Sequence, residues 1–98
     1  MSHQDDGAAT SRMRQAVIAF QRAQVALLRT HREIKTRPPA DLEAFWNGKG
    51  GRLEAEVETA ARELVAAFEA FSSAGLVAGA TDRHQVTEAK RYLKEGAG

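Results

Sequence analysis

The sequence predicts an all-α fold, an antiparallel helical hairpin with a short corner helix and a C-terminal helix, in a small bundle of three to four helices. Three observations predict it. Apolar residues recur at alternating spacings of four and three in two long segments. Proline and glycine fall between these segments, where they end helices. The alternation of apolar and polar residues that marks a strand is missing.

A chain of 98 residues corresponds to one domain. We expect residues 11–95 to form this single helical domain, behind a flexible leader at residues 1–10. No apolar run is long enough for a transmembrane helix, and the polar, acidic N-terminus is unlike a signal peptide. The chain has no cysteine, which excludes disulfides and thiolate chemistry. These features predict a cytoplasmic protein, or one secreted without a cleaved signal peptide.

The first long helix is expected to begin after an N-cap hydroxyl from Thr10 or Ser11 and to end by Arg37. Pro38 and Pro39 follow, and each disfavours helical geometry at the residue before it. The helix carries a seam with heptad spacing: Met13, Val17, Phe20, Gln24, Leu27, His31 and Ile34. Three further apolar residues make this face broader than a coiled-coil stripe: Ile18, Val25 and Leu28.

A short corner helix is expected at residues 42–47, with Asp41 as its N-cap. Gly48 then ends the helix in the left-handed conformation that glycine adopts most easily. The glycine-rich residues 48–51 form the turn at which the chain reverses. Phe45 and Trp46 stand just before this turn, so their rings are expected to close the open end of the hairpin.

The second long helix is expected to open at Arg52 and to repeat the same spacing: Leu53, Val57, Ala60, Leu64, Ala67 and Phe71. Small residues and glycines at 72–81 interrupt the pattern. Asp82 and Gln85 have the spacing of a capping box, which predicts the start of a last helix. That helix turns Val86, Ala89 and Leu93 inward and ends at Gly96. The two long helices carry opposite net charges, which favours their pairing, although each exposed pair contributes only about 0.2–1 kcal/mol.

The tripeptide Trp46-Asn47-Gly48, near the middle of a helical chain of 98 residues, resembles the WXG family of small proteins exported by type VII secretion systems. The resemblance covers residues 11–73. It implies a helical hairpin that bends at the tripeptide, pairs as a homodimer or heterodimer into a four-helix bundle, and leaves the cell without a cleaved signal peptide. Pro38-Pro39 in the first arm departs from the family pattern.

We expect a non-enzymatic protein–protein interaction module that binds itself or another helical protein. A polar residue on a helical seam, such as Gln24, often selects the register or the partner of paired helices. The expected interface and bend residues are Phe45, Trp46, Gly48, Gln24, Val25, Val65 and Phe68. If the last helix folds back, it covers the apolar residues among them within the chain. If it does not, an exposed patch larger than a few hundred Å² remains, which indicates a partner.

The alternative function is a small nucleic-acid-associated or phage-type accessory protein that uses the basic end of the first helix. Four side chains there are candidates for contact with phosphate: Arg22, Arg29, Arg32 and Lys35. Such a stripe can hold phosphates, but cations near a helix C-terminus also complement the helix dipole. No aromatic residue is interleaved for base stacking, which favours the protein-interaction hypothesis.

Catalytic, cofactor and metal sites are not expected. A hydrolase nucleophile needs a base and an orienting acid beside it, and Ser72 and Ser73 have no histidine near them in the sequence. The segment Gly48–Gly51 lacks the spacing of a phosphate-binding loop. His31 stands at no metal-ligand spacing from the other two histidines, so we expect it to be a boundary residue of the fold.

Overall fold

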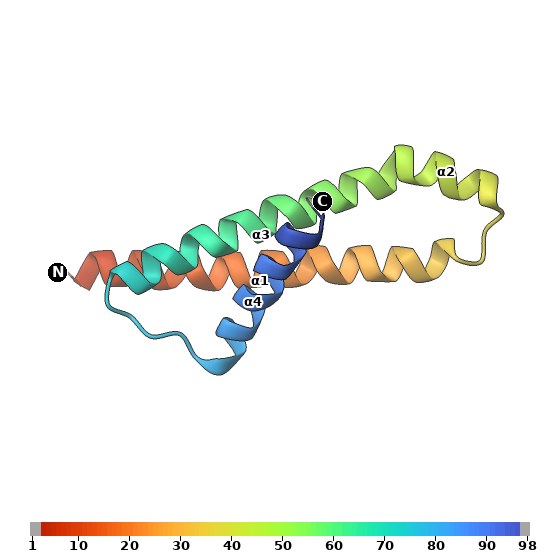
Figure 1. The fold of residues 1–98 in the computed structure, drawn as a ribbon. Helices are drawn as coiled ribbons and strands as arrows, with labels where there is room; N and C mark the ends of the chain where they lie inside the picture. The colour runs from red at the N-terminus through yellow and green to blue at the C-terminus, as the bar shows by residue number, and fades with distance from the viewer. Residues whose placement is uncertain (1–2, 97–98) are drawn as a thin grey trace.

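The computed structural model describes residues 3–96 of the chain. These residues form four helices and no strand. The helices are α1 (His3–Ile34), α2 (Pro39–Asn47), α3 (Lys49–Ser73) and α4 (Ala80–Gly96). Helix α1 runs antiparallel to α2 and α3, and α4 folds back across α1 and α3 (Figure 1). The predicted all-α hairpin is confirmed, and its dimensions of 56 × 22 × 21 Å make it elongated.

Helix α1 begins earlier than expected. It starts at His3, so residues 3–10 of the predicted leader are helical, while residues 1–2 lie outside the described part. Thr10 does not act as the N-cap. Its hydroxyl donates a hydrogen bond of 2.8 Å to the carbonyl oxygen of Asp6, one turn earlier in the same helix. A threonine hydroxyl that bonds to the carbonyl oxygen four residues earlier can lie inside a helix. The sequence therefore contains a false start signal at Thr10, and the expected start was wrong.

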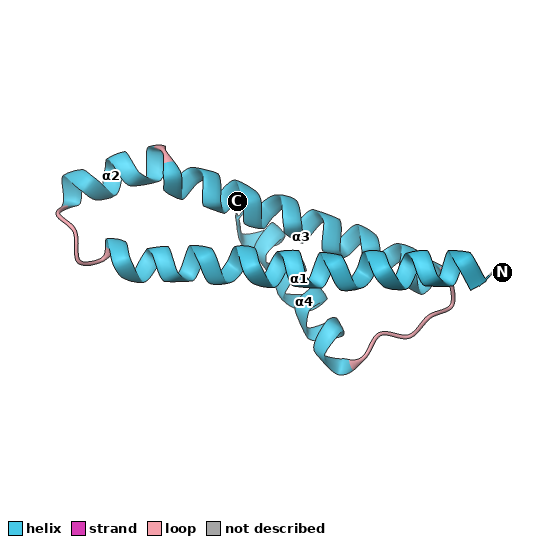
Figure 2. Cartoon of the chain, turned by 180° about the vertical axis from the view of Figure 1, so that it is seen from behind, coloured by secondary structure: helices cyan, strands magenta, loops and turns pink. Residues whose placement is uncertain are grey.

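The chain reverses at residues 35–38, not at the glycine-rich segment. The amide of Arg37 donates to the carbonyl oxygen of Ile34 at 3.0 Å as α1 ends. Pro38 is extended, with φ −60° and ψ 152°, and Pro39 is the first residue of α2. Proline suits this first position because it lacks only an amide proton that has no partner there. The two prolines therefore make the turn, which lies at the end remote from the N-terminus (Figure 2).

Helices α2 and α3 form one arm with a break at a single residue. Gly48 separates them, and its φ of −119° and ψ of −102° are not left-handed as predicted. Helix α3 begins at Lys49 instead of Arg52, so the expected turn at residues 48–51 is mostly helix. The arm runs through this point without reversing (Figure 1). Gly50 is buried there, because α2 packs closely against the start of α3 where a turn was expected.

The core lies between α1, α3 and α4. Phe20 of α1 and Leu64 of α3 are both completely buried, as the two seams predict. The inward positions predicted for α4 are confirmed, because Val86 and Ala89 are buried and Leu93 packs against the core. The complete set of buried apolar residues is Met13, Ala16, Val17, Phe20, Val57, Ala61, Leu64, Ala67, Phe71, Ala78, Val86 and Ala89.

The connection from α3 to α4 is where glycine flexibility matters. Gly75 has a φ of 82° and follows Ala74, the C-cap residue of α3. The amide of Leu76 donates to the carbonyl oxygen of Phe71 at 3.2 Å, which is the bond of a Schellman motif. Helix α4 then begins at Ala80, before the predicted cap, and the buried Oε1 of Gln85 has no hydrogen-bond partner. The expected capping box is therefore not formed.

Candidate functional site

The hairpin consists of two halves that differ in how well they are covered. We call residues 13–23 of α1, residues 57–71 of α3 and the whole of α4 the proximal half. The distal half comprises residues 24–34 of α1, all of α2 and residues 49–56 of α3. The apolar core belongs to the proximal half and its loop, because Val57 is the buried side chain closest to the distal end of α3.

Helix α4 reaches only the edge of the distal half. Near its C-terminus, the hydroxyl of Tyr92 donates to the backbone carbonyl oxygen of Glu54 at 3.1 Å. Burial raises the pKa of this phenol above its usual value, so the hydroxyl keeps its proton. In both views of the chain, α4 lies across the middle of the hairpin and away from α2 (Figures 1 and 2). The distal half therefore has two layers of helix where the proximal half has three.

An aromatic cluster joins the two arms of the distal half. The rings of His31 and Trp46 lie 4.7 Å apart between centroids, and those of Phe45 and Trp46 lie 5.0 Å apart, edge to face. All three side chains are half-buried. A Cβ added to Gly50 would lie 2.5 Å from Cε1 of Phe45 and would also collide with the Trp46 ring. The glycine therefore lets the rings rest on α3, and the predicted bend residues hold α2 in place.

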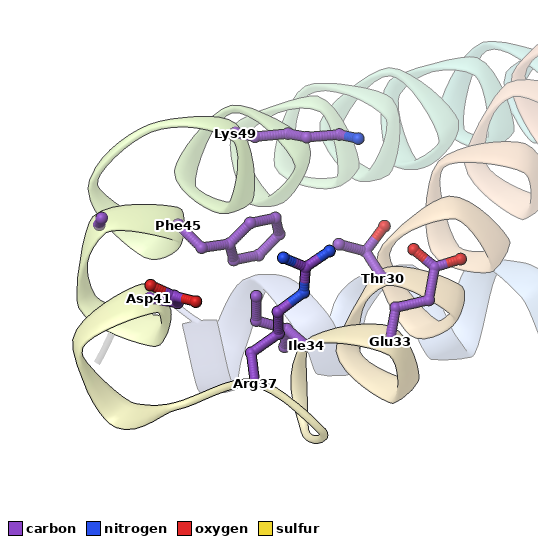
Figure 3. Close-up of a pocket in the computed structure, with 8 residues that line it drawn as sticks. Thr30, Glu33, Ile34, Arg37, Asp41, Phe45 and Lys49 are labelled. Carbon is purple, nitrogen blue, oxygen red and sulfur yellow. The ribbon is translucent and has the colours of Figure 1, made fainter.

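A hollow of about 550 Å³ lies beside the cluster, between the end of α1 and α2. Its lining residues are Thr30, Glu33, Ile34, Arg37, Asp41, Ala44, Phe45 and Lys49. The side chain of Arg37 reaches into it between Phe45 and Thr30 (Figure 3). The four charged lining residues are exposed and include two of each sign. The hollow thus has no net charge by which it could select an ionic ligand.

The outer face of α1 carries exposed apolar side chains. Ile18 is 41% exposed, Val25 52% and Leu28 57%. Val25 follows Ile18 by seven residues, so the two lie on one side of the helix, turned away from the buried Phe20. Leu28 follows Val25 by three residues and extends the patch toward the distal end. Two of these three side chains, Val25 and Leu28, belong to the distal half, where α4 gives no cover.

Arginines surround this patch at intervals of one helical turn. Arg14 precedes Ile18 by four residues and Arg22 follows it by four, while Arg29 and Arg32 follow Val25 and Leu28 by four. Residues four apart are neighbours on a helix surface. We call the seven residues together the outer face of α1: Arg14, Ile18, Arg22, Val25, Leu28, Arg29 and Arg32. No acidic residue occurs in the sequence between Gly7 and Arg32. Glu33, four residues after Arg29, is the one carboxylate of α1 that lies within a turn of these arginines.

None of the four arginines takes part in the ion pairs found within residues 3–96. Those pairs are Arg12–Glu63, Arg62–Glu58 and Arg91–Glu88. The first joins the two arms, and the nitrogen–oxygen distance between Nε of Arg12 and Oε1 of Glu63 is 2.7 Å. The hydrogen bond from Arg12 holds the pKa of Glu63 below its usual value. The four arginines of the outer face thus form no ion pair within the described residues. Arg22 lines a hollow between α1 and α3 together with Glu56 and Glu63.

The structure separates the predicted interface residues into different surroundings. Gln24 is half-buried on α1, and Val25 beside it is exposed. Val65 and Phe68 are partly buried against the core of the same chain, and Nζ of Lys90 on α4 lies 5.9 Å from the Phe68 ring centroid. Gly48 is exposed at the break between α2 and α3. Of this set, only Val25 lies on the outer face of α1.

The predicted phosphate-contacting residues stay together only in part. Arg22, Arg29 and Arg32 are exposed on the outer face, whereas Lys35 lies in the turn after α1. Three residues of the face were in neither predicted set: Arg14, Ile18 and Leu28. Their signal was the spacing of four that places an arginine one turn from each exposed apolar residue. This spacing was overlooked because Leu28 also fits the edge of the inward seam.

Within the described residues, no three His, Cys, Asp or Glu side chains are grouped so that they could hold a metal ion. In the same range no helix has the length and apolar character needed to cross a membrane. Comparisons with protein-family models, with curated proteins and with solved structures give no match to this chain.

Proposed function

We propose that the protein is a non-enzymatic helical interaction module that binds another protein, or a second copy of itself, through the outer face of α1. One observation carries the proposal. Val25 and Leu28 are 52% and 57% exposed on the half of the hairpin that α4 does not cover. The chain already closes a core of its own with α4, so these residues are not needed to complete the fold.

The energetics favour burial of this face in a complex. Removing apolar area from water contributes about 25 cal/mol per Å². Ile18, Val25 and Leu28 lie along one straight helix, and a second helix could cover them together. Arginine is enriched in protein interfaces, where it forms directed hydrogen bonds. An aliphatic strip with arginines beside it therefore suits a protein partner.

Site-specific photocrosslinking tests this proposal. A photoreactive amino acid at position 25 should crosslink a protein in the cells that produce the chain, because this position faces the partner. The same group at position 62, exposed on α3, should give no such product and is the control. Equal yields from both positions, or no product from position 25, would contradict the proposal.

The mass of the native protein distinguishes the kinds of partner. We expect a second copy to give twice the monomer mass at micromolar concentration, and a foreign partner to appear only after co-expression with the neighbouring gene product. The WXG-like role, which includes pairing into a four-helix bundle and export without a cleaved signal peptide, remains a prediction. A stable monomer in both preparations would remove that pairing.

A second candidate function rests on the same four arginines. Their exposure without ion-pair partners supports contact with the phosphates of a nucleic acid by an accessory protein. Binding of a DNA or RNA duplex should then weaken steeply with salt and depend on Arg29 and Arg32. It should not depend on Val25, because phosphate contacts gain nothing from an aliphatic side chain. If a Val25→Ser variant loses its cellular partner, that result would thus favour a protein as the partner.

A further inference from the structure

From the charges and spacing of the outer face of α1, we infer that its partner is an acidic amphipathic helix, which places an apolar stripe on Ile18, Val25 and Leu28 and carboxylates opposite the arginines. This inference rests on the proposed function and adds the chemistry of the partner.

Charge complementarity selects the partner. Arg14, Arg22, Arg29 and Arg32 are exposed and outside the ion pairs of the described residues. A partner that covers the apolar side chains also removes water from the guanidinium groups beside them. That step is unfavourable unless acceptors replace the water, and a carboxylate accepts two parallel hydrogen bonds from one guanidinium. A neutral partner offers weaker acceptors than a carboxylate, and a basic partner adds repulsion between like charges.

The geometry favours a helix as the element that brings these carboxylates. The face extends from Arg14 to Arg32, roughly 27 Å at 1.5 Å per residue. Its apolar strip is one or two side chains wide and has an arginine one turn from each member. A partner helix with apolar residues at spacings of three and four matches this strip, and its Glu or Asp residues at the flanks reach the arginines.

A membrane surface fits the same face less well. Helices that lie in the interface of a bilayer insert a broad apolar face that often includes tryptophan or phenylalanine. The exposed apolar side chains of the outer face of α1 are only three aliphatic residues. The half-buried Trp46 lies elsewhere and packs on His31. A duplex of nucleic acid would pair with the arginines but would leave the aliphatic strip in water.

The experiment uses the full-length protein and three synthetic amphipathic helical peptides. They share a leucine stripe and carry Glu, Gln or Lys at every flanking position. By fluorescence anisotropy, the Glu peptide should bind with a micromolar Kd that rises with salt. The Gln peptide should bind about tenfold more weakly, as expected for the loss of several exposed charge pairs, and the Lys peptide should not bind.

Two charge variants locate the interaction. Arg29→Glu with Arg32→Glu should weaken binding of the Glu peptide by about tenfold or more and should create binding of the Lys peptide. Arg83→Glu with Lys94→Glu makes the same change in net charge on exposed positions of α4, and should leave the Kd of the Glu peptide nearly unchanged. All four positions are exposed, so circular dichroism should show that both variants fold.

Several results would overturn the inference. The first is equal binding of the Glu and Gln peptides, and the second is an equal effect of the two double variants on the Kd. The third is failure of the Glu peptide to bind at concentrations about 100-fold above a micromolar Kd. Binding to phosphatidylglycerol vesicles or to a DNA duplex, with no binding of the Glu peptide, would also overturn it and assign the face to that surface. If position 25 still crosslinks a protein in cells while the Glu peptide fails, the acidic partner is wrong and the proposed function stands. Absence of the crosslink rejects the proposed function itself.

Discussion

The proximal and distal halves of the hairpin are built from the same apolar spacing but reach different degrees of burial. In the proximal half, Met13, Val17 and Phe20 are buried against α3 and α4. In the distal half, the next seam positions Leu27 and Ile34 are only partly buried. The difference is the third helix. Two helices bury one stripe each, whereas a third covers their shared flank and closes the core.

The largest expected effect comes from one substitution made in each half. Leu64→Ala removes a completely buried side chain and should lower the free energy of unfolding by about 3 kcal/mol, within the usual range for buried leucine. Leu27→Ala in the distal half should cost less than about half as much, because its side chain already contacts water. Urea unfolding followed by circular dichroism measures both, and equal losses would show that the two halves are packed alike.

A smaller effect is expected where α2 rests on α3. Gly50→Ala places a Cβ into the rings of Phe45 and Trp46, and should destabilise the protein by about 1–3 kcal/mol, as overpacking usually does. The emission of Trp46 should shift to longer wavelength as the ring moves into water. Gly79→Ala is the matched control, because a Cβ there meets nothing within 4 Å. A normal emission spectrum in Gly50→Ala would mean that the aromatic cluster is loose.

A still smaller effect should follow from acid. The hydrogen bond from Arg12 lowers the pKa of Glu63 in the folded state below its ordinary value of 4.5. A lowered folded pKa stabilises the fold above the unfolded pKa, and this contribution disappears as pH falls through the folded value. The stability difference between the protein and Glu63→Gln should therefore be largest near neutral pH and shrink as the pH falls below 4.5 through the lowered folded-state pKa. A difference that stays constant over this range would exclude the ion pair as its cause.

The smallest expected effect is on the outer face of α1. Leu28→Gln should change the free energy of unfolding by less than about 0.5 kcal/mol, because the side chain is 57% exposed. The same substitution should weaken binding of a partner. Urea unfolding and the peptide titration of this single variant separate the two roles. A clear loss of stability would mean that Leu28 serves the fold, as its place at the edge of the seam suggested.

The candidate site could be foreseen only in part. Exposed Val25 and three of its neighbouring arginines were identifiable from spacing and charge. Val65 and Phe68 have the same apolar character as Val25 in the sequence, yet they are partly buried within the chain. The sequence also placed the reversal at Gly48, where the arm instead continues. Gly48 tolerates several backbone conformations, so its presence predicts a break without fixing the direction that the chain takes.

By itself the sequence determined the helical character of the two long arms and of the last segment, although not where each helix begins. It also determined that Phe20 and Leu64 face inward, because the spacing of apolar residues follows from the pitch of the helix. It also determined that the first long helix ends before Pro38 and Pro39, since proline restricts its own backbone and that of its neighbour. Only the tertiary structure decided where α4 lies and how far it reaches. Coverage depends on the path of the loop and on contacts between residues distant in the chain, and no local pattern encodes these. That placement left Phe68 partly buried against the core, whereas Val25 and Leu28 on the outer face of α1 stay exposed.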